Sequence, residues 1–294
     1  MKIEPLAGAL GAELIDVDLS APMNDLEFAE LHSAFLDYQV VFFPGQNLTT
    51  AQHRDFAMRF GELDIPVFVP PFETPPVAGH PEIYQLVKEP DNHSVNLGGF
   101  WHADVTHRET PNLASIAYVR EAPSSGGDTL FANLYLAYET LSCGMQDMLD
   151  SMCAVHTSAM PYGGGSVRST AVSREHVQST EAVNFEMDQV ESEELETVHP
   201  VVRRHPGSGR KSLYVNRGFT SHFEGWTMDE SYPLLKFLWE HAERPEFTCR
   251  YRWAVGTVGI WDNRCVLHYA LNDYYGQRRV LHRISVNEAT RPSA

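Results

Sequence analysis

Apolar residues recur at helical spacing in three parts of the chain. Phe28, Leu31 and Phe35 follow Asn24, and Glu27 stands three residues after that asparagine. Asn24 and Glu27 form a capping-box pattern, so we expect a helix to begin after Asn24. The same pattern joins Thr227 to Glu230 before the apolar positions Leu234, Leu235, Leu238 and Trp239.

A further helix is predicted to begin at Thr49 or Thr50 and to run through Phe60. Gly61 suits its end, because glycine readily adopts the left-handed conformation that closes a helix.

Much of the remaining chain has the pattern of short strands separated by Gly/Pro turns. Residues 247–253 (FTCRYRW) alternate strictly, with Phe, Cys, Tyr and Trp on one side and Thr, Arg and Arg on the other. We expect further strands at VVFF (40–43, before Pro44), LASIAYV (113–119), SLYVN (212–216) and TVGIW (257–261).

Many short strands with a few helices favour a sandwich or jelly roll with helices packed outside. We find no internal repeat or long linker, and residues 1–294 are predicted to form one domain. The polar, Gly/Ser-rich segment 163–180 is either an ordinary surface loop or a lid over a site.

The charge balance excludes one class of partner. The chain carries 22 Lys and Arg against 39 Asp and Glu, which gives a net charge of −17. A nucleic-acid-binding protein needs a basic face to neutralise phosphates, and the sequence has no Lys/Arg cluster of that kind. We therefore expect no nucleic-acid partner.

Cysteine placement and the N-terminal sequence favour the cytoplasm. Cys143, Cys153, Cys249 and Cys265 form no C-x-x-C pair, and we expect them to be buried, reduced thiols. The N-terminus has acids where a signal peptide needs an apolar stretch, and no apolar run approaches the roughly 18 residues of a membrane span. The prediction is a cytoplasmic protein without membrane partners.

The candidate chemistry begins in GGFWHADVTHRETP at 98–111. His102 and Asp104 are separated by one residue, so on an extended strand both side chains would point to the same face. His268 is the candidate for a third ligand. Two imidazoles and one carboxylate form the facial triad of non-haem iron(II), which leaves the opposite coordination positions open. The alternative is a structural His–Asp hydrogen bond.

Arginines follow the third candidate ligand in RVLHRISV at 279–286. Arg279 and Arg283 are four residues apart, so on a strand both guanidinium groups would face one cavity. Inward arginines are costly unless anions meet them, and a guanidinium can grip a carboxylate with two parallel hydrogen bonds. The alternative is that Arg278, Arg279 and Arg283 form surface ion pairs.

With these residues in place, the sequence resembles the taurine dioxygenase (TauD/TfdA) family of iron(II)- and 2-oxoglutarate-dependent dioxygenases. The resemblance covers nearly the whole chain, because several motifs occur in the family's order: LAGALGAELIDVDL, VVFFPGQ, RFGELD, WHADVTHRETP, SSGGDTLFAN, HPVVRRHPGSGRKSLYVNRGF and WDNRCVLHYALNDYYGQRRVLHR.

The resemblance implies roles for individual residues. His102, Asp104 and His268 match the catalytic iron ligands. Thr129 and Arg279 match residues that bind 2-oxoglutarate, and Arg283 matches an arginine near both the cosubstrate and the anionic end of the substrate. Trp261 and Phe219 occupy positions near the cavity, and the alternative for each is a core aromatic residue. We expect substrate contacts from Arg283, Phe219, Gly98 and Val69.

The implied fold is mainly β with flanking helices around a double-stranded β-helix, a jelly-roll, cupin-like core. The implied cofactors are Fe(II), 2-oxoglutarate and O2, and the reaction couples decarboxylation of 2-oxoglutarate to hydroxylation of an unactivated C–H bond. If the attacked carbon bears O, S or N, the hydroxylated product can fall apart. Oligomers are common in the family, so we expect a homo-oligomer.

Departures from the taurine-specific pattern indicate the substrate class. The stretch DIPVFVPPFE at 64–73 lacks the histidine and tyrosine that hold a sulfonate in those enzymes, and NLGGFW at 96–101 replaces a polar stretch. Motifs in the C-terminal half look closer to the aryloxyalkanoate-degrading members. We therefore expect a small anionic substrate with an apolar or aromatic body, such as an aryloxyalkanoate, an alkyl sulfate or sulfonate, or a natural-product acid.

Two other functions remain to be compared with this one. A cupin-like metal oxygenase could use the same triad without 2-oxoglutarate, although Thr129 and Arg279 argue against it. A silent binding protein would be expected to lack a ligand, and all three are present.

Overall fold

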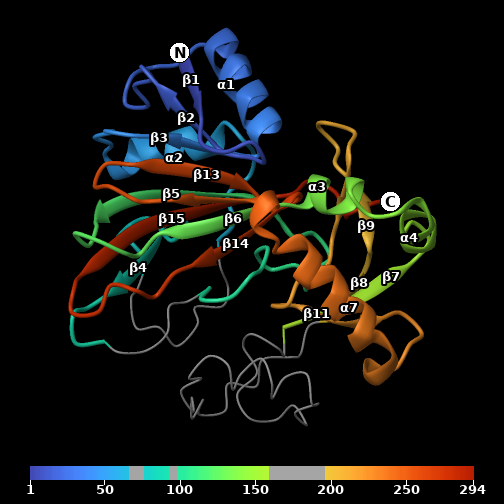
Figure 1. The fold of residues 1–294 in the computed structure, drawn as a ribbon. Helices are drawn as coiled ribbons and strands as arrows, with labels where there is room; N and C mark the ends of the chain where they lie inside the picture. Colours follow the sequence, from blue (N-terminus) through green and yellow to red (C-terminus); the bar gives the residue numbers. More distant parts are fainter. Residues whose placement is uncertain (66–75, 93–97, 159–195) are drawn as a thin grey trace.

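The structure is a computed structural model that describes residues 1–65, 76–92, 98–158 and 196–294. Its largest sheet has the strand order β1-β2-β3-β13-β5-β15-β4 (Figure 1). The strands span Lys2–Pro5 (β1), Ala12–Ile15 (β2), Val40–Phe43 (β3), Tyr84–Lys88 (β4), Asn112–Glu121 (β5), Val258–Asp262 (β13) and Arg279–Asn287 (β15). All these pairings are antiparallel except that of β2 with β3, so the sheet joins the two ends of the chain.

A second sheet packs against the large one. It has the order β12-β6-β14, with strands Thr248–Tyr251 (β12), Thr129–Asn133 (β6) and Val266–Ala270 (β14). Side chains of both sheets form one buried cluster that includes Phe42, Phe131, Tyr251, Trp253 and Trp261. Phe42 lies between Phe131, at a ring distance of 5.7 Å, and the stacked ring of Tyr251. Two facing sheets with a shared aromatic core match the predicted jelly roll.

Two helices cover the other face of the large sheet. Helices α1 (Asp25–Tyr38) and α2 (Thr50–Met58) pack there on alternate residues of β3, Val41 and Phe43, while Phe42 faces the second sheet. The predicted caps are confirmed, because Asn24 and Glu27 form both bonds of a capping box and Thr49 is the N-cap of α2. Helix α2 is shorter than predicted and ends at Met58.

The remaining elements surround a third cluster of buried apolar residues. They include a sheet ordered β11-β7-β8 and a hairpin of β9 and β10. Figure 1 shows the long helix α7 running beside these strands. The bounds are α3 Leu134–Glu139, α4 Cys143–Leu149, β7 Cys153–Thr157, β8 Glu196–Pro200, β9 Val202–Arg204, β10 Lys211–Leu213, β11 Thr220–Phe223, α7 Met228–Ala242 and the 3-10 helix η1 Pro245–Phe247. The predicted capping box of Thr227 and Glu230 begins α7.

Some sequence predictions need correction. Only Ser212 and Leu213 of the predicted strand 212–216 lie in β10, which ends at Leu213. In FTCRYRW the strand is limited to Thr248–Tyr251, since Phe247 closes a 3-10 turn. The four cysteines are free, as predicted, but Cys143 is exposed on α4 and Cys153 is half-buried, so only Cys249 and Cys265 are buried.

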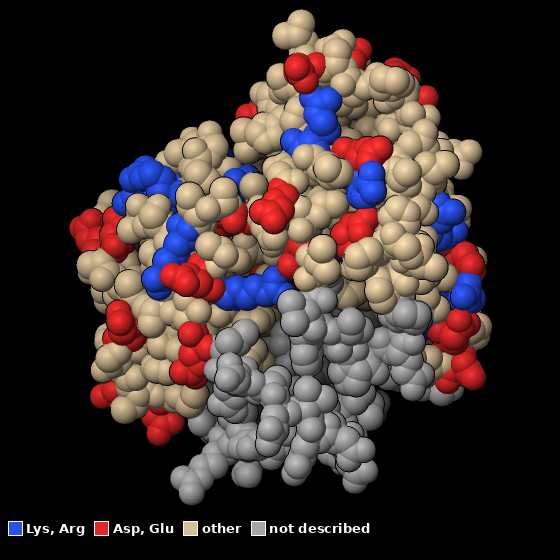
Figure 2. All heavy atoms as spheres, turned by 180° about the vertical axis from the view of Figure 1, so that it is seen from behind, with Lys and Arg blue, Asp and Glu red and all other residues tan. Residues whose placement is uncertain are grey.

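The surface agrees with the charge pattern of the sequence. On the face shown in Figure 2, lysines and arginines lie next to aspartates and glutamates and do not gather into one basic patch. Among the described residues, no helix is both long and apolar enough to span a membrane.

Candidate active site

The backbone brings the first and third candidate ligands together. His268 lies on β14, and His102 and His268 exchange both backbone hydrogen bonds of an isolated β-bridge, with N···O distances of 3.1 and 2.8 Å. The prediction that His102 and Asp104 lie on one strand is wrong. The bridge ends at His102, and the chain turns at Val105, whose φ of 45° is left-handed. The turn still directs Asp104 toward the two histidines.

The three side chains place their donor atoms around one point. Asp104 Oδ1 lies 3.6 Å from His102 Nε2 and 3.7 Å from His268 Nε2. All three ligand atoms lie within 4.8 Å of one another, and all three residues are buried. One metal ion can therefore contact two imidazole nitrogens and one carboxylate oxygen, the donor set of the facial triad.

Hydrogen bonding and burial favour the protonation states that a metal ligand needs. The Nδ1–H of His102 donates to the carbonyl of Phe100 at 2.8 Å, which leaves the lone pair of Nε2 toward the site. Burial, then the neighbouring His102, lowers the pKa of His268 well below its ordinary value. Burial opposes the charged form of Asp104, but Arg283, His268 and His102 outweigh it and hold its pKa well below the usual range.

Arg283 contacts the carboxylate of Asp104 directly. Its Nη2 lies 2.6 Å from Asp104 Oδ2, the oxygen that does not face the two histidines. The guanidinium carbon also lies 5.7 Å from the ring centroid of Trp261, and the Trp261 ring lies 4.9 Å from that of His268. Arg283 is therefore part of the site, and Trp261 forms part of its wall.

The three neighbouring arginines have different surroundings. Arg278 is exposed and pairs with Glu89 and Glu121, as the surface alternative expects. Arg279 is buried, its guanidinium carbon lies 5.9 Å from the ring of Tyr274, and burial lowers its pKa. A buried guanidinium of this kind favours an anionic ligand.

Thr129, at the start of β6, has a hydroxyl group held from one side. The indole Nε1 of Trp253 donates to Thr129 Oγ1 at 2.8 Å, so the hydroxyl proton remains able to donate elsewhere. Gly127, two residues earlier, has a φ of 70°, and a Cβ atom there would lie 3.4 Å from Arg279 Cδ. The turn before β6 thus packs closely on the arginine predicted to bind the cosubstrate.

The residues predicted to contact the substrate lie in different environments. Gly98 packs on a ligand, because a Cβ atom there would lie 2.8 Å from His102 Cε1, and its φ of 77° is also left-handed. Phe219 is buried and stacks on His107 with a ring distance of 5.2 Å. Val69 and the segment 163–180 lie outside the described residues. The close approach of Gly98 to His102 indicates that Gly98 supports this candidate metal ligand.

Three residues of the site were missed by sequence reasoning. Ser115 Oγ donates to Asp104 Oδ2 at 2.7 Å, and Asn263 Nδ2 donates to Ser115 Oγ at 3.2 Å. Tyr84 stands opposite Arg283 in the pairing of β4 with β15, and burial raises its pKa to about 12. A serine inside an otherwise apolar strand was the available signal for Ser115, because a buried hydroxyl needs a partner.

A second group of metal-binding residue types is already satisfied. His205 Nδ1 accepts from the backbone N–H groups of Gly207 and Ser208, and its Nε2–H donates to Asp262 Oδ2 at 2.9 Å. Arg264 binds both oxygens of Asp262, at 2.8 and 2.7 Å. These bonds occupy the side-chain atoms of His205 and Asp262, so we assign a structural role to the cluster that these two residues form with Cys265.

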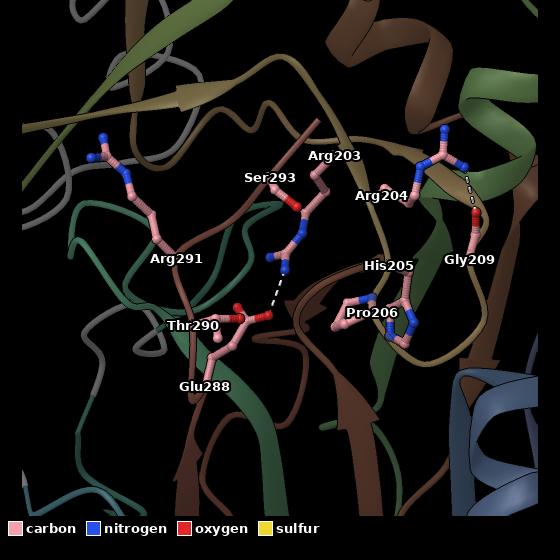
Figure 3. Close-up of a pocket in the computed structure, with 9 residues that line it drawn as sticks. All are labelled: Arg203, Arg204, His205, Pro206, Gly209, Glu288, Thr290, Arg291 and Ser293. Carbon is pink, nitrogen blue, oxygen red and sulfur yellow. Dashed lines mark hydrogen bonds and ion pairs between the residues drawn. The ribbon is translucent and has the colours of Figure 1, made fainter.

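A pocket of about 160 Å³ lies beside this cluster, between β9 and the C-terminal segment. Figure 3 shows that the guanidinium groups of Arg204 and Arg291 lie on opposite sides of it, while Arg203 points to Glu288. Arg204 is bound to the carbonyl of Gly209, and Arg203 Nη2 lies 2.6 Å from Glu288 Oε1. Its arginines do not converge on one ligand, and the pocket is separate from the predicted site.

Comparison with known proteins agrees with this geometry. Residues 2–285 match the model of the family described as taurine catabolism dioxygenase TauD, TfdA family. An alpha-ketoglutarate-dependent sulfate ester dioxygenase of Pseudomonas putida is 34% identical over 97% of this chain and 89% of its own length. The alpha-ketoglutarate-dependent 2,4-dichlorophenoxyacetate dioxygenase of Cupriavidus pinatubonensis is 31% identical over 95% of both chains.

Comparison of the fold with solved structures also points to this family. The crystal structure of a taurine dioxygenase from Burkholderia xenovorans superposes with a TM-score of 0.78 at 35% identity, covering 100% of this chain and 92% of the other. The family match spans nearly the whole sequence and includes both candidate histidine ligands, His102 and His268. This chain belongs to the TauD/TfdA family of 2-oxoglutarate-dependent dioxygenases, whose cofactors are Fe(II), 2-oxoglutarate and O2.

Proposed function

We propose that the protein hydroxylates a small anionic substrate with a largely apolar body, and that a sulfate ester is the first class to test. The observation that supports this most is the convergence of His102, Asp104 and His268 beside Arg283. Three protein donors suit an Fe(II) ion, and the adjacent guanidinium suits an anion near that ion.

The residues present fit the implied cofactors. His102, Asp104 and His268 would hold Fe(II), because the donor set matches, the lone pair of His102 Nε2 faces the site, and burial keeps the His268 ring neutral by lowering its pKa. When bound, iron and 2-oxoglutarate together supply the oxidising power for cleavage of an unactivated C–H bond. Arg279 would bind one carboxylate of 2-oxoglutarate through its guanidinium, and the Thr129 hydroxyl would donate to the same cosubstrate.

Arg283 would orient the substrate through its anionic group. One of its nitrogens is bound to Asp104, and Nε has no hydrogen-bond partner among the described residues. Trp261 and the metal ligands border the same space, so the C–H bond next to the anion would be held near the iron.

The substrate class follows from the anion and from the product chemistry. Hydroxylation at the carbon bearing the ester oxygen, R–CH2–OSO3⁻, gives R–CH(OH)–OSO3⁻, which loses sulfate and a proton to leave the aldehyde R–CHO. Two observations favour this class: the relative named a sulfate ester dioxygenase, and the replacement of the sulfonate-holding residues of taurine enzymes in 64–73. An aryloxyalkanoate is the second candidate, because a 31% identical relative bears that activity in its name.

The test begins without oxygen. Fe(II) and then 2-oxoglutarate are added to the purified protein, and the weak visible absorption of an iron–2-oxoglutarate chelate is recorded. Oxygen is then admitted with alkyl sulfates, aryloxyalkanoates, alkyl sulfonates or N-acyl amino acids, and succinate is measured together with sulfate or phenol release. We expect the absorption band, and stoichiometric aldehyde and sulfate from a medium-chain alkyl sulfate.

Each negative result has a distinct meaning. A band with acceleration only by an aryloxyalkanoate would keep the enzyme class and replace the substrate. A band without acceleration by any compound would contradict the substrate proposal. Loss of the band despite bound iron would contradict the roles of Thr129 and Arg279. The cytoplasmic location, the homo-oligomer and the single domain of 1–294 stay predictions from the sequence.

A further inference from the structure

The two oxygens of the Asp104 carboxylate have different neighbours. Oδ1 faces His102 and His268, at 3.6 and 3.7 Å from their Nε2 atoms. Oδ2 faces away from the histidines and accepts from Ser115 Oγ at 2.7 Å and from Arg283 Nη2 at 2.6 Å. The protein itself therefore orients the carboxylate, with one oxygen toward the site and the other held by protein donors.

Ser115 is a fixed donor for that second oxygen. It lies in the middle of β5, where it is fully buried and pairs with Trp261 of β13 and with Ser285 of β15. Because both neighbouring strands hold the backbone of Ser115, and its side chain is buried, the position of the hydroxyl group is restricted. It differs in this from Arg283, whose long side chain is 18% exposed.

Asn263 sets the direction of the Ser115 hydroxyl. Asn263 Nδ2 donates to Ser115 Oγ at 3.2 Å, which uses a lone pair and leaves the hydroxyl proton for Asp104. Asn263 Oδ1 also accepts from the backbone N–H of Asp104, at 3.4 Å, and Asn263 N donates to the carbonyl of Leu113 at 3.0 Å. Asn263 is 1% exposed, so the whole arrangement is shielded from water.

We propose that Ser115 and Asn263 are a positioning pair that keeps Asp104 a one-oxygen ligand of the iron. A carboxylate free to rotate could place both oxygens on the metal and occupy a position needed by 2-oxoglutarate or O2. An incoming anion can draw Arg283 from Asp104, but it cannot reach the buried hydroxyl of Ser115. The pair therefore retains the carboxylate's orientation through the binding of both substrates. This inference rests on the proposed metal ligands and not on the proposed substrate.

The test uses metal binding and a spectrum in place of turnover. Ser115→Ala and Asn263→Ala are compared with the control Ser285→Ala. Ser285 is buried on β15 directly opposite Ser115, and among the described contacts its hydroxyl has none with Asp104. The affinity for Mn(II) is measured from the electron paramagnetic resonance signal of the free ion. We expect roughly 10- to 100-fold weaker binding for Ser115→Ala, the range for loss of a group that orients a metal ligand. Ser285→Ala should bind like the wild type.

The Fe(II)–2-oxoglutarate absorption band provides a second measurement. We expect its maximum to shift in Ser115→Ala, because the coordination of Asp104 changes, and to be unchanged in Ser285→Ala. Ser115→Thr keeps a hydroxyl and should recover most of the affinity. If Asn263 acts through Ser115, the double variant should bind Mn(II) no more weakly than Ser115→Ala alone.

The outcomes separate this inference from the proposed function. The proposed role of the pair would be overturned if Ser115→Ala and Asn263→Ala both bound Mn(II) as tightly as the wild type and left the absorption band unchanged. This holds even if either variant unfolds at a lower temperature. If Ser115→Ala does not fold, Asn263→Ala decides alone. If the wild type itself binds neither Mn(II) nor Fe(II) at the triad, the metal assignment fails and the inference with it. Failure of every compound in the substrate panel leaves the inference intact.

Discussion

Arg283 and Asp104 form an ion pair inside the candidate metal centre, with Arg283 Nη2 at 2.6 Å from Asp104 Oδ2. The pair links a residue predicted to bind the substrate anion to a residue predicted to bind iron. An anion that contacts Arg283 is therefore held next to the metal through a single intervening carboxylate. We infer that substitution of Arg283 affects the substrate and the metal together, unlike substitution of a remote substrate contact.

Arg283→Ala should raise KM for the anionic substrate by roughly 10- to 100-fold, which corresponds to loss of a hydrogen bond to a charged group. Mn(II) affinity should fall by a smaller factor, because Ser115 still holds Asp104 Oδ2. The matched control is Arg278→Ala, which removes an exposed arginine paired with Glu89 and Glu121 on the surface. Steady-state kinetics with the substrate found in the panel check the result, and unchanged KM, turnover and uncoupled succinate formation would contradict it.

Trp253→Phe should weaken 2-oxoglutarate binding by about five-fold, the effect of losing one net hydrogen bond of about 1 kcal/mol. The indole Nε1 of Trp253 holds Thr129 Oγ1 at 2.8 Å and leaves the threonine proton for the cosubstrate. Titration of the visible absorption band with 2-oxoglutarate measures the Kd. Trp239→Phe is the control, because Trp239 is also buried but its Nε1 has no hydrogen-bond partner among the described residues. The same Kd in both variants would show that Trp253 does not act through Thr129.

Helix starts were predictable because their signals are local. Asn24 and Glu27, like Thr227 and Glu230, are three residues apart and form their bonds within one turn. The family motifs likewise pointed to the three candidate metal ligands, whose donor atoms the structure brings together. Both kinds of signal are contained within a short piece of sequence.

The errors concern pairings between distant segments. The prediction of a strand through His102 and Asp104 used local alternation, but the single bridge of His102 is with His268 far along the chain. Ser115 and Asn263 were missed for the same reason: a serine in LASIAYV acquires its meaning only when Asp104 and Asn263 are brought against it. Sheet register decides such contacts, and one sequence does not show it.

The buried ion pair of Arg203 and Glu288 should be important for stability and not for catalysis. Their side chains are 1% and 3% exposed, with 2.6 Å between Nη2 and Oε1. Glu288→Leu leaves a buried guanidinium without its partner, and we expect about 3–5 kcal/mol lower free energy of unfolding. Chemical denaturation measures this, while Mn(II) affinity should be unchanged.

Two further variants provide controls for that loss. Arg203→Met combined with Glu288→Leu should recover most of the stability, because no buried charge then remains. Glu139→Ala breaks a pair with Arg210 whose side chains are 43% and 40% exposed, and should cost less than about 1 kcal/mol. Similar losses for Glu288→Leu and Glu139→Ala would show that burial does not strengthen the dependence of Arg203 on Glu288.

His53 should make the folded protein sensitive to acid. It is 1% exposed on α2, lies 5.7 Å from the ring of Tyr118, and burial lowers its pKa to about 3. A histidine with a lowered pKa stays neutral in the folded state and binds a proton more readily when unfolded. Its contribution to stability is therefore complete above pH 6.5, the ordinary value, and is lost as the pH falls from there toward 3.

The expected size follows from that difference. At pH 5 the unfolded state gains about 2 kcal/mol from protonation of His53, since each pKa unit corresponds to about 1.4 kcal/mol. His53→Leu removes this term and keeps an apolar side chain in the core, so its free energy of unfolding should fall less steeply between pH 7 and pH 5. Urea denaturation of both proteins at several pH values measures the two slopes. Parallel slopes would mean that His53 is protonated in the folded state as easily as in the unfolded chain.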